Sequence, residues 1–250
     1  GNWDLGDENS AGAPWVKGFD EFAGYLGSSD AEDFYANYIF RYAPNSIFDE
    51  TNNRFNAYIG REPLIANDHG AKNKYIPDVF ANAAVNFIEV NESDAANDYR
   101  PFFLLVNYEI PNSNIEVPTD APFSEEPWPQ PEKNRAALIA LIDNSVGDLR
   151  TKLKDNGMTN NVVIFFSSGS LPEKTTQIDP DFFHSNLSSG DRRVPMIVCW
   201  PERIPAGQVS GYKWSPWDFL PTAAEIGYAK TPANVDGTSV LLKMTGGRMP

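Results

Sequence analysis

Residues 101–106, Pro-Phe-Phe-Leu-Leu-Val, decide the fold class, because a short and uninterrupted apolar run is typical of a strand buried on both faces of a sheet. A second such run lies at 162–166 and a third at 194–199. Between the first two, apolar residues recur every three or four positions, which predicts a long helix from Pro131 to the stop at Asn156-Gly157. A strand, a helix and a strand in this order predict a βαβ crossover in a parallel sheet, and hence an α/β protein.

Outward from this unit, the helical spacing of apolar residues predicts two more helices, from Pro77 to about residue 90 and over 216–226. Six prolines between 111 and 131 predict a long surface loop. Residues 1–75 are rich in Gly, Asn, Asp and aromatics and show no sustained period. We therefore expect a single domain over 1–250, with a loop-rich aromatic region at 1–75 and an α/β core at 76–250.

The composition restricts the partners that the chain can have. It contains 34 acidic and 20 basic residues and carries a formal charge of −14, which disfavours nucleic acid, anionic lipid and sulfated glycans. No apolar run approaches the roughly 18 to 20 residues that span a bilayer, so we expect no membrane span. The single cysteine, Cys199, excludes an internal disulfide framework.

Several blocks, in order, resemble the sulfatase family of the alkaline-phosphatase-like superfamily. They are Gly18–Leu26 (the family's GFDEF-x-GYL), Tyr35–Arg41, Pro101–Val106, Trp128–Asn134 (WPxPxKN), Val162–Ser167, Arg193–Gly207 (RVPxIVxWPxxIPAG), Trp217–Thr222 and Asp236–Ser239. The resemblance implies a large central sheet flanked by helices. In active members it also implies a calcium-dependent sulfuric ester hydrolase with a formylglycine nucleophile, in which carboxylates and an amide hold the cation and Lys and His grip the sulfate.

The residues at the family's functional positions differ from those that the resemblance implies. In the family's GKWHLG loop, Asn2 replaces the Lys and Asp4 replaces the His, while Asn112 replaces the His of a Pro-His pair. Ser168 and Gly169 replace the metal-binding Asp and Asn of a Ser-Asp-Asn-Gly run. The upstream segment that carries the paired metal aspartates and the nucleophile is absent from the sequence. We therefore predict a degenerate site with no catalytic residue, no metal ligand and no cofactor.

Two short patterns complete the set of candidate residues. Cys199, Pro201 and Arg203 fit the Cys-x-Pro-x-Arg pattern that is converted to formylglycine, but they coincide with the family's structural segment after a buried strand, so we interpret the match as a coincidence. Asn91 and Asn186 begin N-glycosylation sequons, which permit a secreted glycoprotein.

The sequence therefore favours a non-catalytic, sulfatase-like protein that acts as a structural or interaction subunit with protein partners in a larger assembly. Two alternatives stay open. One is a fragment of a calcium-dependent sulfuric ester hydrolase whose catalytic half lies upstream or on another chain. The other is a carbohydrate-binding module that takes a glycan in the retained cleft. The family implies export, and the sequons agree, so we expect an extracellular or luminal/periplasmic location.

Overall fold

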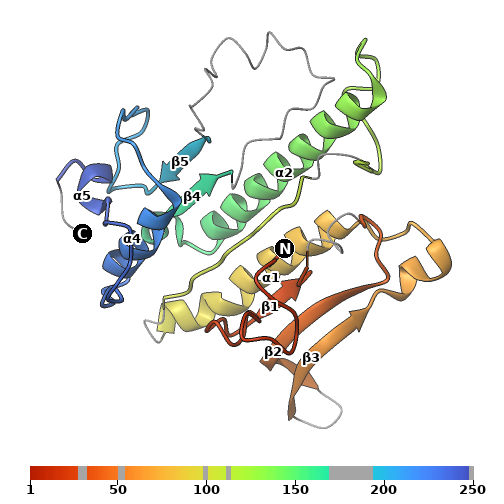
Figure 1. Ribbon diagram of the computed structural model, residues 1–250, viewed down its shortest axis with the longest axis horizontal. Coiled ribbons are helices and arrows are strands. Elements are labelled where there is room, and N and C mark those ends of the chain that lie inside the picture. The colour runs from red at the N-terminus through yellow and green to blue at the C-terminus, as the bar shows by residue number, and fades with distance from the viewer. Residues whose placement is uncertain (28–32, 50–53, 98–100, 111–113, 169–193, 248–250) are drawn as a thin grey trace. The chain divides into compact units, whose positions relative to one another are not determined.

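The computed structural model describes residues 1–27, 33–49, 54–97, 101–110, 114–168 and 194–247, with side chains undescribed at 44–59 and 92–97. The chain divides into two compact units, which are described separately below. Unit 1 comprises 1–98 and 102–152, and unit 2 comprises 99–101 and 153–250. Both contain helices and strands, as an α/β protein should (Figure 1). The single domain predicted over 1–250, with its boundary after residue 75, stays a prediction.

Unit 1 contains an antiparallel sheet in the order β1(Phe22–Gly24), β2(Tyr38–Asp49) and β3(Arg54–Pro63). The prediction of a loop-rich region was therefore wrong for these residues. Two adjacent residues of β2, Ile39 and Phe40, are 1% and 6% exposed, so both faces of the strand are covered here. A strand buried on both faces lacks the apolar and polar alternation that marks a half-buried strand, so the sequence gives no clear strand pattern here.

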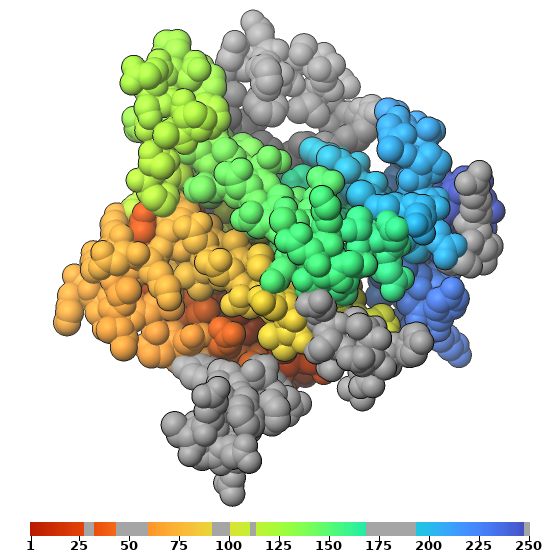
Figure 2. All heavy atoms as spheres, turned by 180° about the vertical axis from the view of Figure 1, so that it is seen from behind, coloured from red at the N-terminus to blue at the C-terminus, as the bar shows by residue number. Residues whose placement is uncertain are grey.

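The two long predicted helices are confirmed as α1(Ile76–Asn97) and α2(Gln130–Asp155), which lie side by side in Figures 1 and 2. Lys152 of α2 and Glu89 of α1 form an ion pair of 3.1 Å between them. The buried faces of the helices contribute to two clusters of buried residues, Tyr25, Ala36, Ile39, Leu64, Ile76 and Phe80 in one and Phe34, Tyr75, Ile115, Leu138 and Ile142 in the other. Helical periodicity predicted these elements correctly because each buries a single stripe.

The predicted doubly buried strand at 101–106 is wrong in this structure. Residues 101–110 are described but belong to no strand, and their exposure alternates along the segment. The Phe102 ring packs edge-on against Phe87 of α1, with 5.7 Å between ring centroids, whereas Phe103 and Leu105 are 53% and 54% exposed. The apolar run is thus an extended segment with one face packed on α1, because apolar composition does not by itself supply the neighbouring strands that bury a second face.

Unit 2 contains a two-stranded sheet of β4(Ile164–Ser167) and β5(Met196–Cys199), at two of the three predicted strand positions. The strands are antiparallel, with Ile164 opposite Cys199. The parallel βαβ crossover was predicted between 101–106 and 162–166, and it is wrong because 101–106 is not a strand. The sheet joins the second and third apolar runs instead of the first and second.

The predicted helix at 216–226 is confirmed as the short helix η3(Pro216–Asp218) followed by α4(Phe219–Ile226). Its start is fixed by buried Asp218, whose carboxylate accepts hydrogen bonds from the backbone N–H groups of Ser215 (3.0 Å) and Thr238 (2.9 Å). Phe219 packs edge-on against Phe165 of β4, with ring centroids 5.3 Å apart. A last short helix, α5(Leu241–Met244), follows. No helix in the described part of the chain is long and apolar enough to cross a membrane.

Candidate functional site

The first four residues lie in a fixed position within unit 1. The backbone N–H groups of Trp3 and Asp4 donate to the carbonyls of Tyr25 (2.9 Å) and Leu26 (3.1 Å), and the N–H of Asn2 donates to the carbonyl of Asn107 (3.1 Å). A Cβ atom at Gly24 would lie 1.8 Å from the carbonyl oxygen of Gly1, so only glycine permits this close approach. The backbone that carries the predicted site residues is therefore held from both sides.

Asn2, at the position of the family's sulfate-binding Lys, is 7% exposed and makes a structural contact. Its Nδ2 donates to a carboxylate oxygen of Glu109 at 3.2 Å, and the side chain of Asn107 donates to its backbone carbonyl at 2.7 Å. The Oδ1 atom is buried and has no hydrogen-bond partner among the described residues. The Asn2 amide is uncharged, so it cannot neutralise an anionic ligand. Its N–H group already donates to the carboxylate of Glu109.

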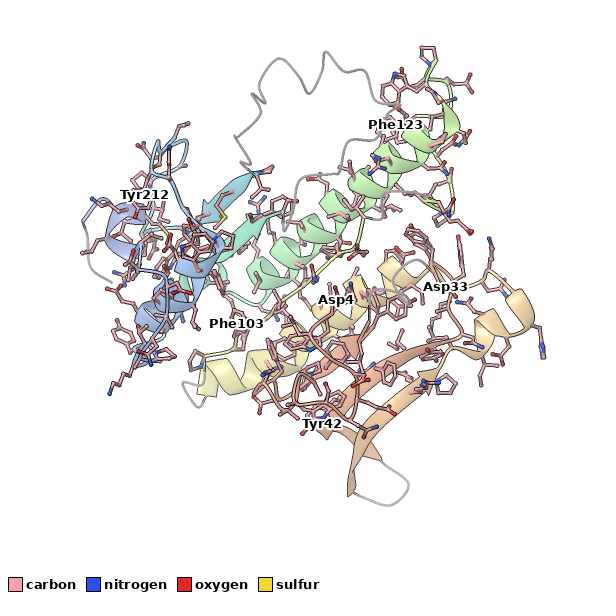
Figure 3. The ribbon with its side chains drawn as sticks, viewed as in Figure 1. Asp4, Asp33, Tyr42, Phe103, Phe123 and Tyr212 are labelled. Carbon is pink, nitrogen blue, oxygen red and sulfur yellow. The ribbon has the colours of Figure 1, made fainter. Side chains whose placement is uncertain are left out.

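Asp4, at the position of the family's histidine, has an exposed side chain and a φ of 58°. A left-handed backbone is tolerated by Asp better than by most residues, because its short polar side chain can bond locally. Figure 3 labels Asp4 among the side chains of unit 1. An aspartate here supplies a carboxylate where the resemblance implies an imidazole.

A small cavity of about 20 Å³ lies beside Asn2, with room for about one water molecule. Its polar lining comes from Asn2, Asp33, Tyr108 and Glu109, and the remaining walls are apolar side chains, among them Phe34, Phe80 and Leu138. The hydroxyl of Tyr108 is hydrogen-bonded to that of Ser145 in α2, and burial raises the pKa of Tyr108. The cavity surface is almost entirely apolar, which makes it a poor receptor for a sulfate group.

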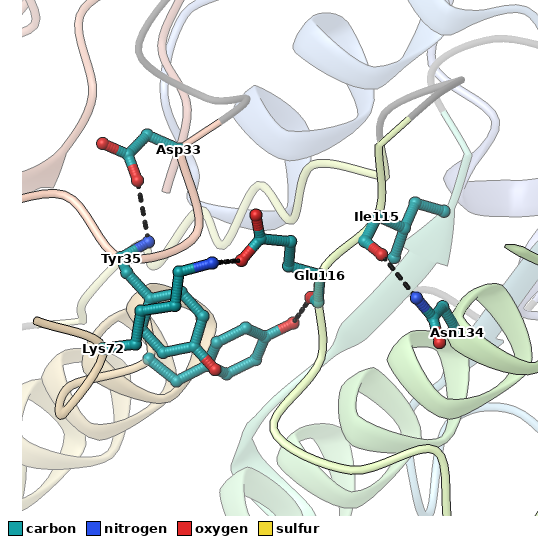
Figure 4. A network of polar contacts seen from close by, with 7 residues as sticks. Asp33, Tyr35, Lys72, Ile115, Glu116 and Asn134 are labelled. Atoms are coloured by element: carbon teal, nitrogen blue, oxygen red, sulfur yellow. Dashed lines mark hydrogen bonds and ion pairs between the residues drawn. The ribbon is translucent and has the colours of Figure 1, made fainter. Parts of the chain in front are cut away.

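A polar network on unit 1 joins residues 72–75 to residues 115–116 and to α2 (Figure 4). Tyr75 donates from its hydroxyl to the backbone carbonyl of Glu116 at 2.9 Å, and Lys72 forms an ion pair with the Glu116 carboxylate. The side chain of Asn134 in α2 donates to the carbonyl of Ile115 at 2.8 Å. Burial is the largest cause that raises the pKa of Tyr75, so this phenol stays protonated at neutral pH. The network holds these segments of unit 1 together.

Sequence reasoning missed Glu109, Asn107 and Asp33, which the fold brings to Asn2. Glu109 follows the apolar run by three residues and Asp33 precedes β2, and neither belongs to a motif. The one signal in the sequence was the Asn2 substitution itself. A buried asparagine amide needs a hydrogen-bond acceptor. Asn2 in place of the lysine therefore indicates an acceptor on a neighbouring segment of the chain.

The downstream candidates belong to unit 2. Ser168 has an exposed side chain, whereas Gly169 and Asn186 lie outside the described residues, as does Asn112 of the upstream group. Among the described residues, no group of three or more His, Cys, Asp or Glu side chains is placed to hold a metal ion. A serine hydroxyl supplies no negative charge, so the donor at this position does not fit a calcium site of the family type.

Cys199 ends β5 and is half buried, with Ile164 as its cross-strand partner. The residues after it form a turn, in which the N–H groups of Arg203 and Ile204 donate to the carbonyl of Trp200 at 3.1 and 2.9 Å. Cys199, Pro201 and Arg203 therefore occupy a strand followed by a turn, the geometry expected of the family's structural segment. The interpretation of the match as a coincidence stays a prediction.

The Asn91 sequon lies inside helix α1, not in a loop. The Asn91 side chain donates to the backbone carbonyl of Phe87 at 2.9 Å, one turn earlier. The amide nitrogen that a glycan would modify is thus engaged in the folded helix. Glycosylation at this position stays a prediction.

Comparisons with known proteins identify the family. The sulfatase family model matches residues 1–227, so the chain belongs to the sulfatase family. It is 30% identical over 181 residues to N-acetylgalactosamine-6-sulfatase of Canis lupus familiaris, covering 68% of this chain and 33% of that protein. It is 27% identical over 179 residues to an arylsulfatase of Hemicentrotus pulcherrimus, covering 68% of this chain and 30% of that protein.

The structure agrees with the family assignment. A solved structure of Ps i-CgsB in complex with k-i-k-neocarrahexaose superposes with a TM-score of 0.70 and 26% identity, covering 99% of this chain and 54% of that chain. The Bacteroides fragilis protein yidJ, 17% identical with a TM-score of 0.62, is similar in fold. The predicted family and α/β fold class are therefore confirmed. The chain spans about a third of the length of the curated relatives it matches.

Proposed function

We propose that this chain is a non-catalytic member of the sulfatase family that acts as a structural or interaction subunit. The hydrogen bond from buried Asn2 to Glu109 carries the proposal. A lysine at this position in active relatives would present a positive charge to sulfate. Here the side chain is neutral and faces a carboxylate, so the local field opposes an anion.

The sign of the local charge supports the loss of sulfate binding. A carboxylate repels an anion beside it, and solvent screening weakens this repulsion at the exposed Glu109. Glu109 and Asp33 line the cavity beside Asn2. Without a lysine or a bound cation, no described charge at this cavity offsets their repulsion. We propose that the degenerate positions Asn2, Asp4, Asn112, Ser168 and Gly169 together abolish hydrolysis, and that the protein needs no calcium.

The surviving parts of the domain are those that hold the fold. Packing residues such as Leu138 and Phe80 lie in buried clusters, and the Asp218 cap and the polar network at Glu116 are intact. Retention of the framework without the reactive side chains favours a role in assembly. We further propose protein partners and an extracellular or luminal/periplasmic location.

Two other functions stay candidates. A portion of an active calcium-dependent sulfuric ester hydrolase is favoured by the family alone. Glycan binding is favoured by the structural neighbour that was solved with an oligosaccharide. Both differ from the main proposal in measurable properties, namely turnover in the first case and saccharide affinity in the second.

Two measurements test the proposed function. In isothermal titration with sodium sulfate, we expect no saturable binding at about 10 mM, tenfold above a Kd of 1 mM, whereas an active sulfatase serves as the positive control. In size-exclusion chromatography with light scattering, protein from the native source should elute in a complex with another polypeptide. Saturable sulfate binding, or a particle that contains no other polypeptide, contradicts the proposal.

A further inference from the structure

Two aromatic rings are stacked at the surface of the loop that precedes α2. The ring centroids of Phe123 and Trp128 lie 5.8 Å apart with an interplanar angle of 25°. Trp128 remains 42% exposed in this arrangement. Figure 3 shows Phe123 well away from Asp4, so this pair does not take part in the site described above. Part of the indole surface is thus accessible to a ligand, while Phe123 supports the ring from one side.

The loop is held in one conformation by its own hydrogen bonds. The carboxylate of Asp120 accepts from the Ser124 hydroxyl (2.6 Å) and from the Gln130 side chain (3.0 Å), and the ammonium of Lys133 donates to the carbonyl of Ser124 (2.6 Å). Prolines at 118, 122, 127, 129 and 131 restrict the backbone further. Because the loop is already ordered, a ligand that binds to the two rings causes little further loss of the loop's conformational entropy.

The polar groups around the rings define the chemistry of the ligand. The side chains of Glu125 and Glu126 are exposed in the same loop and can accept hydrogen bonds from hydroxyl groups. Their charges, with that of Asp120, oppose sulfate and carboxylate substituents. The Ser124 and Gln130 hydrogen bonds lower the pKa of Asp120, so this charge persists at mildly acidic pH.

We propose that Phe123 and Trp128 form a binding platform for a neutral saccharide, with one face of a pyranose ring on the indole and its hydroxyls on Glu125 and Glu126. This inference goes beyond the proposed function and does not depend on it, because a chain with or without hydrolytic activity has the same loop. It also differs from the predicted glycan cleft, since it assigns the glycan to residues 120–130, which include none of the degenerate positions.

The experiment titrates the full chain with neutral galactohexaose, cellohexaose and xylohexaose and follows tryptophan fluorescence and saturation-transfer NMR. We expect at least one of these to bind saturably at about 10 mM, tenfold above a Kd of 1 mM. The Trp128→Ala variant should weaken that binding at least about tenfold, and Trp128→Phe should restore part of it. The matched control is Trp217→Ala in unit 2, which removes a tryptophan of 60% exposure and should leave the affinity unchanged.

Several results would overturn the inference. One is the absence of saturable binding by all three saccharides while circular dichroism shows the protein folded. Another is binding that Trp128→Ala leaves unchanged. A third is tighter binding of a sulfated or a cationic oligosaccharide than of its neutral counterpart, because the acidic loop would then select a different ligand from the one proposed. Loss of aryl sulfate turnover, or its presence, has no bearing on these outcomes.

Discussion

Asn2 and Glu109 are joined by a hydrogen bond of 3.2 Å although 107 residues separate them in the sequence. The contact ties the first segment of unit 1 to the end of the extended segment at 101–110. It also places a neutral donor to an anion where the family resemblance implies a lysine.

A double-mutant cycle measures this contact. Asn2→Ala, Glu109→Ala and the double variant should give a coupling free energy of about 1 kcal/mol, because the bond has a charged acceptor but Glu109 is exposed. The free energy of unfolding from urea denaturation provides the measurement. A coupling energy near zero would mean that the two side chains do not interact in solution.

The turn at Asp236–Ser239 is expected to tolerate no side chain at Gly237. A Cβ atom there would lie 2.0 Å from the backbone oxygen of Trp217, so Gly237→Ala should destabilise the protein by about 2 kcal/mol or more. The matched control is Gly147, which is exposed in the middle of α2, where an added Cβ would meet no atom within 4 Å. Gly147→Ala should raise the stability by about 0.5–1 kcal/mol. Equal effects of the two substitutions in thermal denaturation would contradict this packing.

The Thr222 hydroxyl is expected to hold α4 against the residues that follow Ser239. It donates to the carbonyl of Asp218 at 2.6 Å and accepts from the N–H of Val240 at 3.1 Å, and the residue is fully buried. Thr222→Val leaves a buried N–H without an acceptor and should cost about 1–3 kcal/mol. Thr222→Ser keeps the hydroxyl and should cost less. If Thr222→Ser proves the more damaging in urea denaturation, the hydroxyl has no such role.

Glu21 should make stability depend on pH. Burial is the largest cause that raises its pKa above the ordinary value of 4.5, with Asp20 adding to the rise and Arg41 opposing it. The folded state therefore binds the proton more tightly than the unfolded state, and the ionised side chain lowers stability above the raised pKa. Glu21→Gln should stabilise the protein at pH 7, and this gain should shrink as the pH falls toward 4.5.

The control for this pH dependence is Glu126→Gln, at an exposed position in the loop before α2. It should change the melting temperature little at any pH. A Glu21→Gln variant whose melting temperature differs from that of the wild type by the same amount at pH 4 and pH 7 would show that Glu21 has the same pKa in the folded and unfolded states.

The helices could be predicted from the sequence, and the strand pairing could not. The α2 pattern, with Leu138 and Ile142 four residues apart on one buried face, is local and repeats at the helical period. β2 and β3 are consecutive in the sequence, but β2 is covered on both faces at Ile39 and Phe40 and so lacks the alternation that marks a strand. The antiparallel register of Ile164 with Cys199 joins residues that are distant in the sequence. β2 and β3 were therefore missed, and the pairing of β4 with β5 was not predicted.

The candidate site was predictable only in part. The resemblance located Asn2 and Asp4 by their position in a motif, and the structure shows that one is buried and the other exposed. The carboxylate beside Asn2 was not predictable, because Glu109 reaches it through the path of the extended segment after Pro101. Side chains brought together by such a path have no fixed spacing in the sequence.

The most direct test of the central claim is the hydrolysis of an aryl sulfate by protein from the native source, assayed with calcium beside an active sulfatase. We expect no release of the phenol above the rate without protein, since Asn2 and Asp4 supply neither the cation nor the imidazole of the active site. Turnover that rises in proportion to protein concentration and disappears when calcium is chelated would contradict the account and identify the chain as part of a working hydrolase.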